Sequence, residues 1–297
     1  MNAFVFPGQG SQKVGMGRVV CDRFEPARTL FERANDVLGY DLRQLCWEGP
    51  EEQLTDTRHA QPALLTVGTM YYHEAISRGL QAQMAAGHSL GEYTALVASG
   101  ALDFEDALRL VQRRAELMAA APPGTMAALI GLADEKIDEV LESAGSQGVV
   151  VAANYNSPGQ VVISGEPVAV EAAMQEAKTR GAKMAVRLPV SGAFHSPLLR
   201  EAGEQMAQLI EAAPFRDAAI PVYQNATAQP ATKVDDLKAA LRAQMTSPVR
   251  WTETMRAMIS DGATQFYELG PGNVLSGLIK RIDKTGAVEN ASSWDNA

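Results

Sequence analysis

The chain carries the pentapeptide Gly87-His88-Ser89-Leu90-Gly91, which places a serine between two glycines, each two residues away. This spacing is typical of a nucleophile elbow, a strained strand-to-helix turn that exposes a hydroxyl to a cleft. A short apolar run at 84–86 precedes the pentapeptide, and apolar residues at helical spacing follow it. We therefore predict a reactive Ser89 at a helix N-terminus, where N–H groups stabilise negative charge. The alternative is a serine that only caps the helix.

The composition bounds the class of protein. The chain has 297 residues, of which 46% are hydrophobic, and a formal net charge of −9. It is long enough to bury a large core in one or two domains. The acidic balance, without a basic block, argues against nucleic acid or an anionic membrane as a partner. The sequence shows no basic leader and no run of about 18 apolar residues, which predicts a soluble, cytoplasmic protein.

The cysteines and histidines are scattered along the chain. Cys21 and Cys46 form no C-x-x-C pair, and the histidines, at positions 59, 73, 88 and 195, form no H-x-x-x-H pair. We therefore expect neither a metal site nor a disulfide framework.

The N-terminal part reads as one strand followed by helices. A strand is expected at 4–6, and the glycine-rich loop at 7–12 could bring backbone N–H groups close to a ligand. An ordinary strand-to-helix turn is the alternative, and no Gly-Lys-Ser/Thr follows that would make a phosphate loop. Apolar periodicity predicts several helices within 18–80.

A strongly patterned helix is expected at 103–121, and one residue on its apolar stripe is charged. Arg114 lies three residues after Val111 and four before Met118, on the same face. Because a buried, unpaired charge costs several kcal/mol, its guanidinium needs an anion. An internal Asp or Glu is one candidate, and a substrate carboxylate held by two hydrogen bonds is the other.

After the break at 122–124, the expected elements alternate between short strands and helices. A strand (126–132), a helix (134–144), two strands (149–154 and 160–165), a helix (167–180) and a strand (183–188) follow. This β-α-β-β-α-β order is that of a ferredoxin-like unit. We expect residues 125–189 to form a small domain inserted into a larger one that comprises 1–124 and 190–283. Residues 284–297 are polar and have no evident core to join, so a mobile tail is expected.

His195 is expected on a loop just before a helix, a place where functional residues gather. A polar surface histidine is the alternative. Beside an elbow serine, however, His195 is the candidate base, because His59 and His73 lie on the polar sides of helices and His88 adjoins the serine. A strand at 221–225, a helix at 234–244, a strand at 266–269 and a helix at 274–282 complete the expected elements.

Five motifs occur in one order and spacing: Phe6-Pro7-Gly8-Gln9-Gly10, Gly87-His88-Ser89-Leu90-Gly91-Glu92, Arg114, Gly192-Ala193-Phe194-His195 and Glu268-Leu269-Gly270-Pro271-Gly272. Over residues 4–282 the chain resembles the malonyl-CoA:acyl carrier protein transacylases. The resemblance implies an α/β fold: an α/β-hydrolase-like large domain with a mostly parallel sheet and an inserted ferredoxin-like small domain.

The resemblance also implies roles for matching residues. Ser89 would be the nucleophile and His195 its base. The backbone N–H groups of Gln9 and Leu90 would form an oxyanion hole, with Gln9 also touching the substrate. Arg114 would clamp the malonyl carboxylate.

Two further positions follow from the same resemblance. A backbone carbonyl near Gln244, rather than an acidic side chain, would orient the histidine, and Phe194 is similar to the residue in malonyl-selecting members. The implied reaction passes malonyl from malonyl-CoA to the phosphopantetheine thiol of acyl carrier protein in a ping-pong cycle. It needs no metal or other cofactor, and a monomer is expected.

Docking of an acidic carrier protein on this acidic chain requires a local basic patch. The candidates lie in the inserted domain and at the closing helix: Lys178, Arg180, Lys183, Arg187, Lys280, Arg281 and Lys284. Scattered solvated charge is the alternative reading of these residues.

Three other functions remain open from the sequence. A serine hydrolase or thioesterase would share the elbow and the histidine, with an acidic residue between them in sequence. A stand-alone acyltransferase for a polyketide synthase would use the same chemistry with another carrier. A non-catalytic binding module would require Ser89 and His195 to match the motifs by coincidence.

Overall fold

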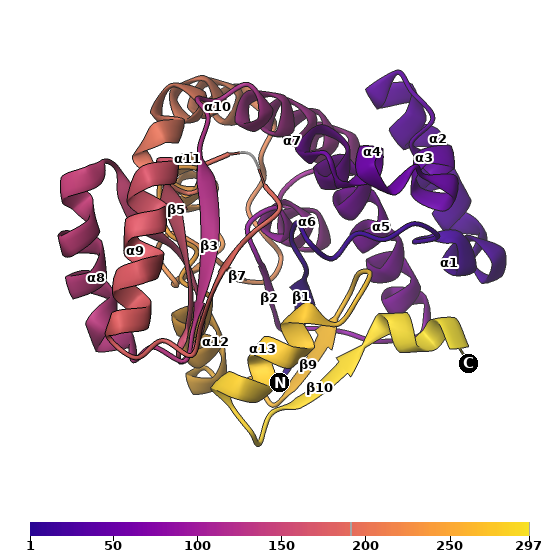
Figure 1. The fold of residues 1–297 in the computed structure, drawn as a ribbon. Coiled ribbons are helices and arrows are strands. Elements are labelled where there is room, and N and C mark those ends of the chain that lie inside the picture. The colour runs from indigo at the N-terminus through magenta and orange to yellow at the C-terminus, as the bar shows by residue number, and fades with distance from the viewer. Residues whose placement is uncertain (191, 297) are drawn as a thin grey trace.

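The computed structural model describes residues 1–190 and 192–296, which form two separate β-sheets (Figure 1). The larger sheet has the order β10-β9-β1-β2-β7-β8, and its strands are parallel except for β8, which is antiparallel to β7. Its strands are β1 (Asn2–Phe6), β2 (Met84–Gly87), β7 (Val222–Tyr223), β8 (Pro230–Ala231), β9 (Gln265–Glu268) and β10 (Ala287–Asn290). The carboxyl ends of β1, β2 and β9 therefore meet at one edge, where ligands bind in open parallel sheets.

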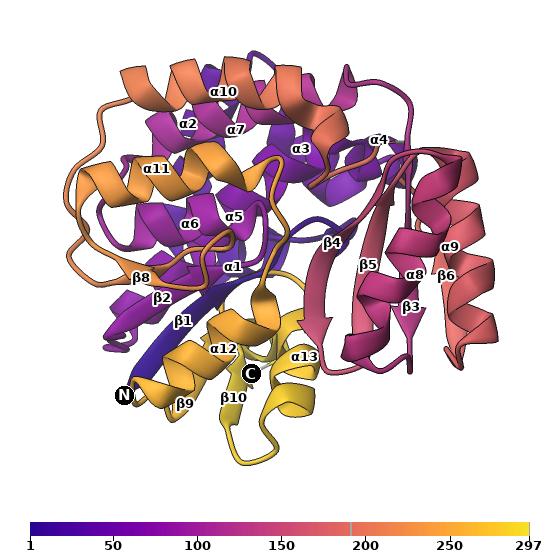
Figure 2. The same cartoon turned by 90° about the vertical axis from the view of Figure 1, so that its left-hand side faces the viewer.

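Helices cover both faces of this sheet (Figure 2). One face carries the larger core and the helices α1 (Arg18–Arg23), α2 (Glu25–Leu38), α3 (Leu42–Glu48), α4 (Glu51–Thr55), α5 (Thr57–Ser77), α6 (Gly91–Ala98), α7 (Phe104–Ala119), α10 (Arg200–Ala212) and α11 (Val234–Gln244). The other face packs on α12 (Trp251–Ser260) and α13 (Val274–Ile282). No helix within 1–190 or 192–296 is long and apolar enough to cross a membrane.

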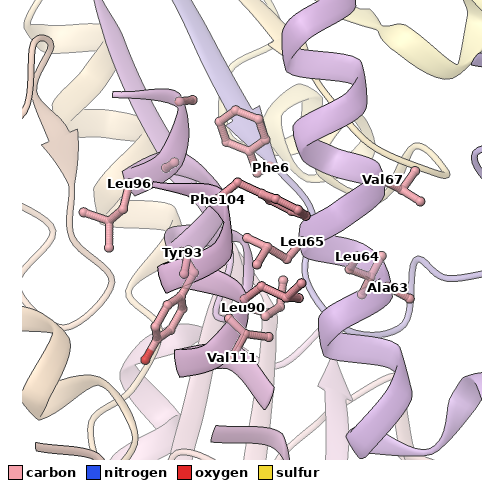
Figure 3. Close-up of a cluster of buried hydrophobic side chains, with 14 of the residues drawn as sticks. Phe6, Ala63, Leu64, Leu65, Val67, Leu90, Tyr93, Leu96, Phe104 and Val111 are labelled. Atoms are coloured by element: carbon pink, nitrogen blue, oxygen red, sulfur yellow. The ribbon is translucent and has the colours of Figure 1, made fainter. Parts of the chain in front are cut away.

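The helix that follows the elbow lies at the centre of the larger core. Leu90 and Leu96 are fully buried, and Figure 3 shows them with Leu64 and Leu65 of α5 and Val111 of α7. These apolar residues recur at helical spacing because only one face of each helix meets its neighbour. The packing fixes the start of α6, and with it the position of Ser89.

The smaller sheet is antiparallel and has its own core. Its strands are β3 (Thr125–Ile130), β4 (Val150–Ser157), β5 (Gln160–Gly165) and β6 (Met184–Arg187), in the order β4-β5-β3-β6, with α8 (Ile137–Ala144) and α9 (Pro167–Thr179) packed on one face. Short 3₁₀ turns lie at Asp134–Lys136, Gly145–Gln147 and Pro197–Leu199. The β-α-β-β-α-β order and this strand arrangement confirm the predicted fold class. Pro123 and Gly192 pair in an isolated antiparallel bridge, so the chain enters and leaves this unit at adjacent points.

Two elements differ from the expectation for the large sheet. The strand predicted at 221–225 is only Val222–Tyr223, because Asn225 bonds to the serine turn through its side chain and to Glu92 through its N–H, instead of continuing the ladder. The helix α12 was not anticipated, although its Trp251 and Met255 are fully buried.

The prediction that the polar C-terminal residues have no core to join is wrong. Residues 287–290 form β10, which pairs with β9, and a 3₁₀ turn follows at Ala291–Asn296. Trp294 is only 7% exposed, and Asp295 accepts a hydrogen bond from the hydroxyl of Tyr71 at 2.7 Å. Backbone pairing to β9 and the buried Trp294 hold a segment whose composition is otherwise polar. Ala297 lies outside the described residues.

Replacing Trp294 by alanine is expected to lower the free energy of unfolding by about 3 kcal/mol, because a large buried side chain is deleted. Its indole also lies 4.6 Å from the Arg78 guanidinium and donates to Glu289 at 2.7 Å. Urea denaturation of the parent and the variant measures the change. Met184→Ala, at a site 53% exposed, is the control and should change stability little. A loss at Trp294 no larger than the control's would mean that the segment does not contribute to the core.

Candidate active site

Ser89 lies at a sharp turn between β2 and α6, with a φ of 51° that side chains rarely adopt. The turn requires glycine on both sides. A Cβ on Gly87 would come within 1.9 Å of the carbonyl carbon of Gly91, and one on Gly91 would come within 2.1 Å of the carbonyl oxygen of Phe6. The Gly-x-Ser-x-Gly spacing thus reflects backbone packed directly on backbone, as in a nucleophile elbow.

The hydroxyl of Ser89 bonds to the imidazole of His195, with 2.8 Å between Oγ and Nε2. The histidine is 3% exposed, and its Nδ1 lies 3.0 Å from the carbonyl oxygen of Gln244 and 3.2 Å from that of Ser247. Because carbonyl oxygens only accept, Nδ1 carries the hydrogen and Nε2 is left to accept from the serine. These two carbonyls occupy the place where a hydrolase triad would have a carboxylate.

Burial, together with the nearby Arg114 cation, lowers the pKa of His195 to about 3. The free enzyme therefore holds a neutral imidazole over the whole neutral range. A neutral imidazole is the form that can take a proton from the serine.

The pH profile of acylation should reflect this lowered pKa. For the acyl transfer that the family resemblance implies, we expect kcat/KM for the acyl donor to show no loss from histidine protonation near pH 6.5, with any such loss well below pH 5. Stopped-flow thiol release between pH 4 and 9 measures the profile. Burial raises the pKa of Glu92 in the same network to about 7, so a fall centred at pH 6.5 that persists in Glu92→Gln would contradict the environment assigned to His195.

Arg114 is 1% exposed, and its guanidinium contacts only neutral groups. Nη1 donates to Gln61 Oε1 at 2.6 Å, and Nη2 donates to Gln244 Oε1 at 3.0 Å and to Ser89 Oγ at 3.1 Å. No carboxylate among the described residues lies within ion-pair distance. Burial lowers the pKa of Arg114, as expected for a cation without a counter-ion. The internal ion pair that the sequence left open is thus not formed.

A cavity of about 260 Å³ opens onto Ser89, His195 and Arg114. Its walls include Gln9, Leu90 and Phe194, so the structure brings these predicted site residues together. The Gln9 amide donates to Thr57 Oγ1 at 3.1 Å. Among the described residues, the backbone N–H groups of Gln9 and Leu90 have no backbone acceptor and are available to a ligand.

The cavity leads outward to a wider basin of about 1110 Å³. The two share a mainly apolar neck: Gln9, Thr55, Met118, Leu188, Pro189, Val190 and Phe194. A thioester on a long pantetheine arm could reach Ser89 through this neck while its bulky head stays in the basin. The apolar walls would limit the access of water.

Several buried polar residues at the site were not identified from the sequence. Gln61 Oε1 accepts from Arg114, and Asn156 Oδ1 accepts from His88 Nε2 at 2.8 Å. Asn225 bonds to the elbow through its side chain, and Glu92 accepts from the Asn225 N–H. Gln61 carried a signal, since it lies three residues before Leu64 on an apolar stretch. The partners of Asn225 are more than 130 residues away along the chain, so no local pattern could reveal them.

Comparison with known proteins agrees with this arrangement of serine, histidine and arginine on an α/β fold. Residues 3–293 match the acyl transferase domain family. A malonyl CoA-acyl carrier protein transacylase of Bacillus subtilis is 44% identical over 286 residues, covering 95% of this chain and 90% of that protein.

Solved structures show the same likeness. The malonyl CoA-acyl carrier protein transacylase of Coxiella burnetii superposes with a TM-score of 0.95 at 41% identity, covering 98% of this chain and 93% of that one. A malonyl-transacylase solved with its type II polyketide synthase acyl-carrier protein gives a TM-score of 0.94 at 41% identity, over 97% and 95% of the two chains.

The fold and site define an acyltransferase with a serine-histidine pair. The chain belongs to the acyl transferase domain family.

Proposed function

We propose that this enzyme transfers a malonyl group from malonyl-CoA to the phosphopantetheine thiol of an acyl carrier protein, through a malonyl-serine intermediate, and so supplies extender units for fatty acid synthesis. The observation that carries the proposal is Arg114, a buried guanidinium beside the nucleophile that lacks an anion. An acyl group that ends in a carboxylate supplies that anion. A planar guanidinium can hold it through two parallel hydrogen bonds.

In the first half-reaction, His195 Nε2 takes the proton of Ser89 as Oγ attacks the thioester carbonyl. The oxyanion that forms would be held by the backbone N–H groups of Gln9 and Leu90, and losing one such donor typically costs about 3 to 4 kcal/mol. Collapse of the intermediate breaks the C–S bond. CoA leaves as the thiol with the proton that His195 returns, and malonyl remains on Ser89.

The second half-reaction reverses these steps with a different thiol. His195 takes the proton of the phosphopantetheine thiol, and the sulfur attacks the malonyl-serine ester. The ester bond breaks, and Ser89 Oγ recovers the proton. Both half-reactions need only side chains and thioesters, so we propose that the enzyme works without a metal or other cofactor. We also propose that it is a monomer in the cytoplasm.

Intact-protein mass after brief exposure to malonyl-CoA tests this function. We expect one malonyl adduct on the parent, none on Ser89→Ala, and loss of the adduct when acyl carrier protein is added. Acetyl-CoA should give little adduct. Steady CoA release without an adduct would indicate a hydrolase, and neither adduct nor release would show that malonyl-CoA is not the donor.

An acyltransferase that serves a polyketide synthase is the alternative, since its chemistry is identical and one structural neighbour is bound to such a carrier. Comparing kcat/KM with fatty acid and polyketide carrier proteins separates the two.

We propose that the carrier docks near Lys280 and Arg281 at the end of α13. In the inserted unit, Arg180 pairs with Glu139 and Glu176, and Arg187 pairs with Glu171, whereas Lys280 and Arg281 have no acidic partner in the described part of the chain. Because their charges are neutralised, Arg180 and Arg187 would attract an acidic partner less strongly. Lys284 lies just after α13 and would add to this charge, whereas Lys178 and Lys183 belong to the inserted unit, on α9 and before β6.

Reversing both charges, in Lys280→Glu/Arg281→Glu, should raise the KM for the carrier protein and reduce its salt dependence, because electrostatic steering is lost. The KM for malonyl-CoA in the first half-reaction should stay the same. Arg180→Glu is the control in the inserted unit. An unchanged carrier KM in the double variant would place the docking surface elsewhere.

A further inference from the structure

A loop after β7 reaches the serine turn from the neighbouring strand. Asn225, which has no solvent exposure, lies two residues beyond the end of β7. Its side-chain amide makes two hydrogen bonds to the turn, one as an acceptor and one as a donor. Oδ1 accepts from the Ser89 N–H at 2.6 Å, and Nδ2 donates to the Gly87 carbonyl at 2.7 Å.

These two bonds fix adjacent peptide planes of the elbow. The Gly87 carbonyl belongs to the peptide before His88, and the Ser89 N–H belongs to the peptide after it. A residue held at a φ of 51° persists only where its surroundings over-determine it. Asn225 therefore supplies part of the restraint that keeps Ser89 in its strained conformation.

Glu92 in turn holds Asn225. Its Oε2 accepts from the backbone N–H of Asn225 at 2.9 Å and from Gln244 Nε2 at 3.1 Å. Glu92 is fully buried, and burial raises its pKa to about 7, although the bonds from Asn225 and Gln244 act in the opposite direction. One carboxylate oxygen thus links the loop after β7 to the end of α11.

Gln244 connects Glu92 to the candidate oxyanion donor and to the base. Gln244 Nε2 also donates to the Ser89 carbonyl at 3.0 Å, which fixes the peptide whose N–H belongs to Leu90. The C=O and N–H of a trans peptide point in opposite directions, so holding one aims the other. The backbone carbonyl of the same Gln244 orients His195.

We propose that Asn225 is a positioning residue for catalysis: clamped by Glu92, it holds the Ser89 turn at the angle at which the nucleophile meets both His195 and the oxyanion donors. This inference rests on the proposed function and deepens it. Asn225 touches neither the reacting atoms nor the cavity, and acts only through Ser89 and its neighbours.

Pre-steady-state acylation by malonyl-CoA tests the proposal. Asn225→Ala should lower the acylation rate constant about 10-fold to 100-fold, because a small misplacement of the reacting atoms has effects of that size. The KM for malonyl-CoA should change less than twofold, since Asn225 bonds neither to Arg114 nor to the apolar neck through which the substrate arm would pass. A residue needed only for folding would instead reduce the active fraction and leave the rate constant of the folded molecules unchanged.

Gln224→Ala provides a matched control. Gln224 is the adjacent residue, 1% exposed, and its amide donates to the Val222 carbonyl at 3.0 Å, away from the elbow. It should cost stability without changing the acylation rate constant. Both variants are compared at a temperature where near-ultraviolet circular dichroism shows them folded.

If Asn225→Ala does not fold, Asn225→Asp is tested instead, because aspartate has the same shape as asparagine. An ionised aspartate can accept from the Ser89 N–H but cannot donate to the Gly87 carbonyl, so its rate relative to the parent should fall as the pH rises from 6 to 9. Taking the ratio to the parent at each pH removes the pH dependence of the substrate and of the assay, which both proteins share. Parent rate constants for every folded Asn225 variant would overturn the inference, whereas an inactive parent would instead remove the proposed function.

Discussion

The Arg114→Ala variant is expected to lose malonyl transfer while keeping or gaining transfer of acetyl groups. In the parent, a malonyl carboxylate neutralises a guanidinium that is already buried and unpaired. An acetyl group leaves the same charge uncompensated. The difference is worth about 2 to 5 kcal/mol, or a factor of about 30 or more in relative rate.

The resting contacts of Arg114 add to this discrimination. Its Nη2 donates to Ser89 Oγ at 3.1 Å, so the nucleophile shares its lone pairs with a cation until a carboxylate competes for that nitrogen. A carboxylate substrate should therefore draw the guanidinium from Oγ, whereas an uncharged acyl group has nothing with which to do so. Removing Arg114 frees the serine for neutral acyl groups.

Competition between malonyl-CoA and acetyl-CoA, read as the two adduct masses on Ser89, measures the preference directly. Arg113→Ala is the control, because Arg113 is the next residue of α7 and pairs with Glu116 on the surface. It should keep the parent ratio. An unchanged malonyl-to-acetyl ratio in Arg114→Ala would exclude the carboxylate clamp.

Replacing Gly87 by alanine is expected to abolish the acyl-serine adduct. The new methyl group would lie 1.9 Å from backbone atoms of Gly91 and 2.4 Å from the Glu92 nitrogen, and none of these can rotate away as a flexible side chain could. The start of α6 must move, which takes the Leu90 N–H and Ser89 Oγ from their positions together. We expect at least a 100-fold loss of acylation, of the order seen when reacting atoms are displaced by about 1 Å.

The adduct assay and a thermal melt give the two readouts for Gly87→Ala. Gly277→Ala is the matched control, since a Cβ there meets no atom within 4 Å and the residue lies inside α13. It should retain full activity and gain slightly in stability through helix propensity. A normal adduct on Gly87→Ala would show that the turn is not held by this backbone contact.

The features that can be predicted from the sequence are those that depend on the spacing of neighbouring residues. The two glycines around Ser89, the apolar stripe that includes Arg114, and the alternating elements of 125–189 each depend on residues close together in the chain. For that reason the small β-α-β-β-α-β unit and a candidate serine-histidine pair could be predicted from the residues. The α/β-hydrolase-like large domain, the roles of Ser89 and His195 and the position of Gln244 followed from the family resemblance.

The remaining features depend on contacts across long sequence separations. Asn225 meets Ser89 across 136 residues, and Gln61 meets Arg114 across 53. The β10 strand joins the sheet by parallel pairing with β9, although its polar side chains suggested no buried role. Hydrogen bonding of this kind leaves no periodic signal in a single sequence.

The bridge between Pro123 and Gly192 has a consequence for how the molecule folds. Ser89 and His195 are 106 residues apart, and much of that separation is the small antiparallel unit, whose two ends meet at the bridge. When this unit folds first, it ties its ends together and shortens the effective loop between nucleophile and base. The entropy of closing that loop then falls before the larger core forms. Folding of the insert before the larger core would therefore favour assembly of the serine-histidine pair.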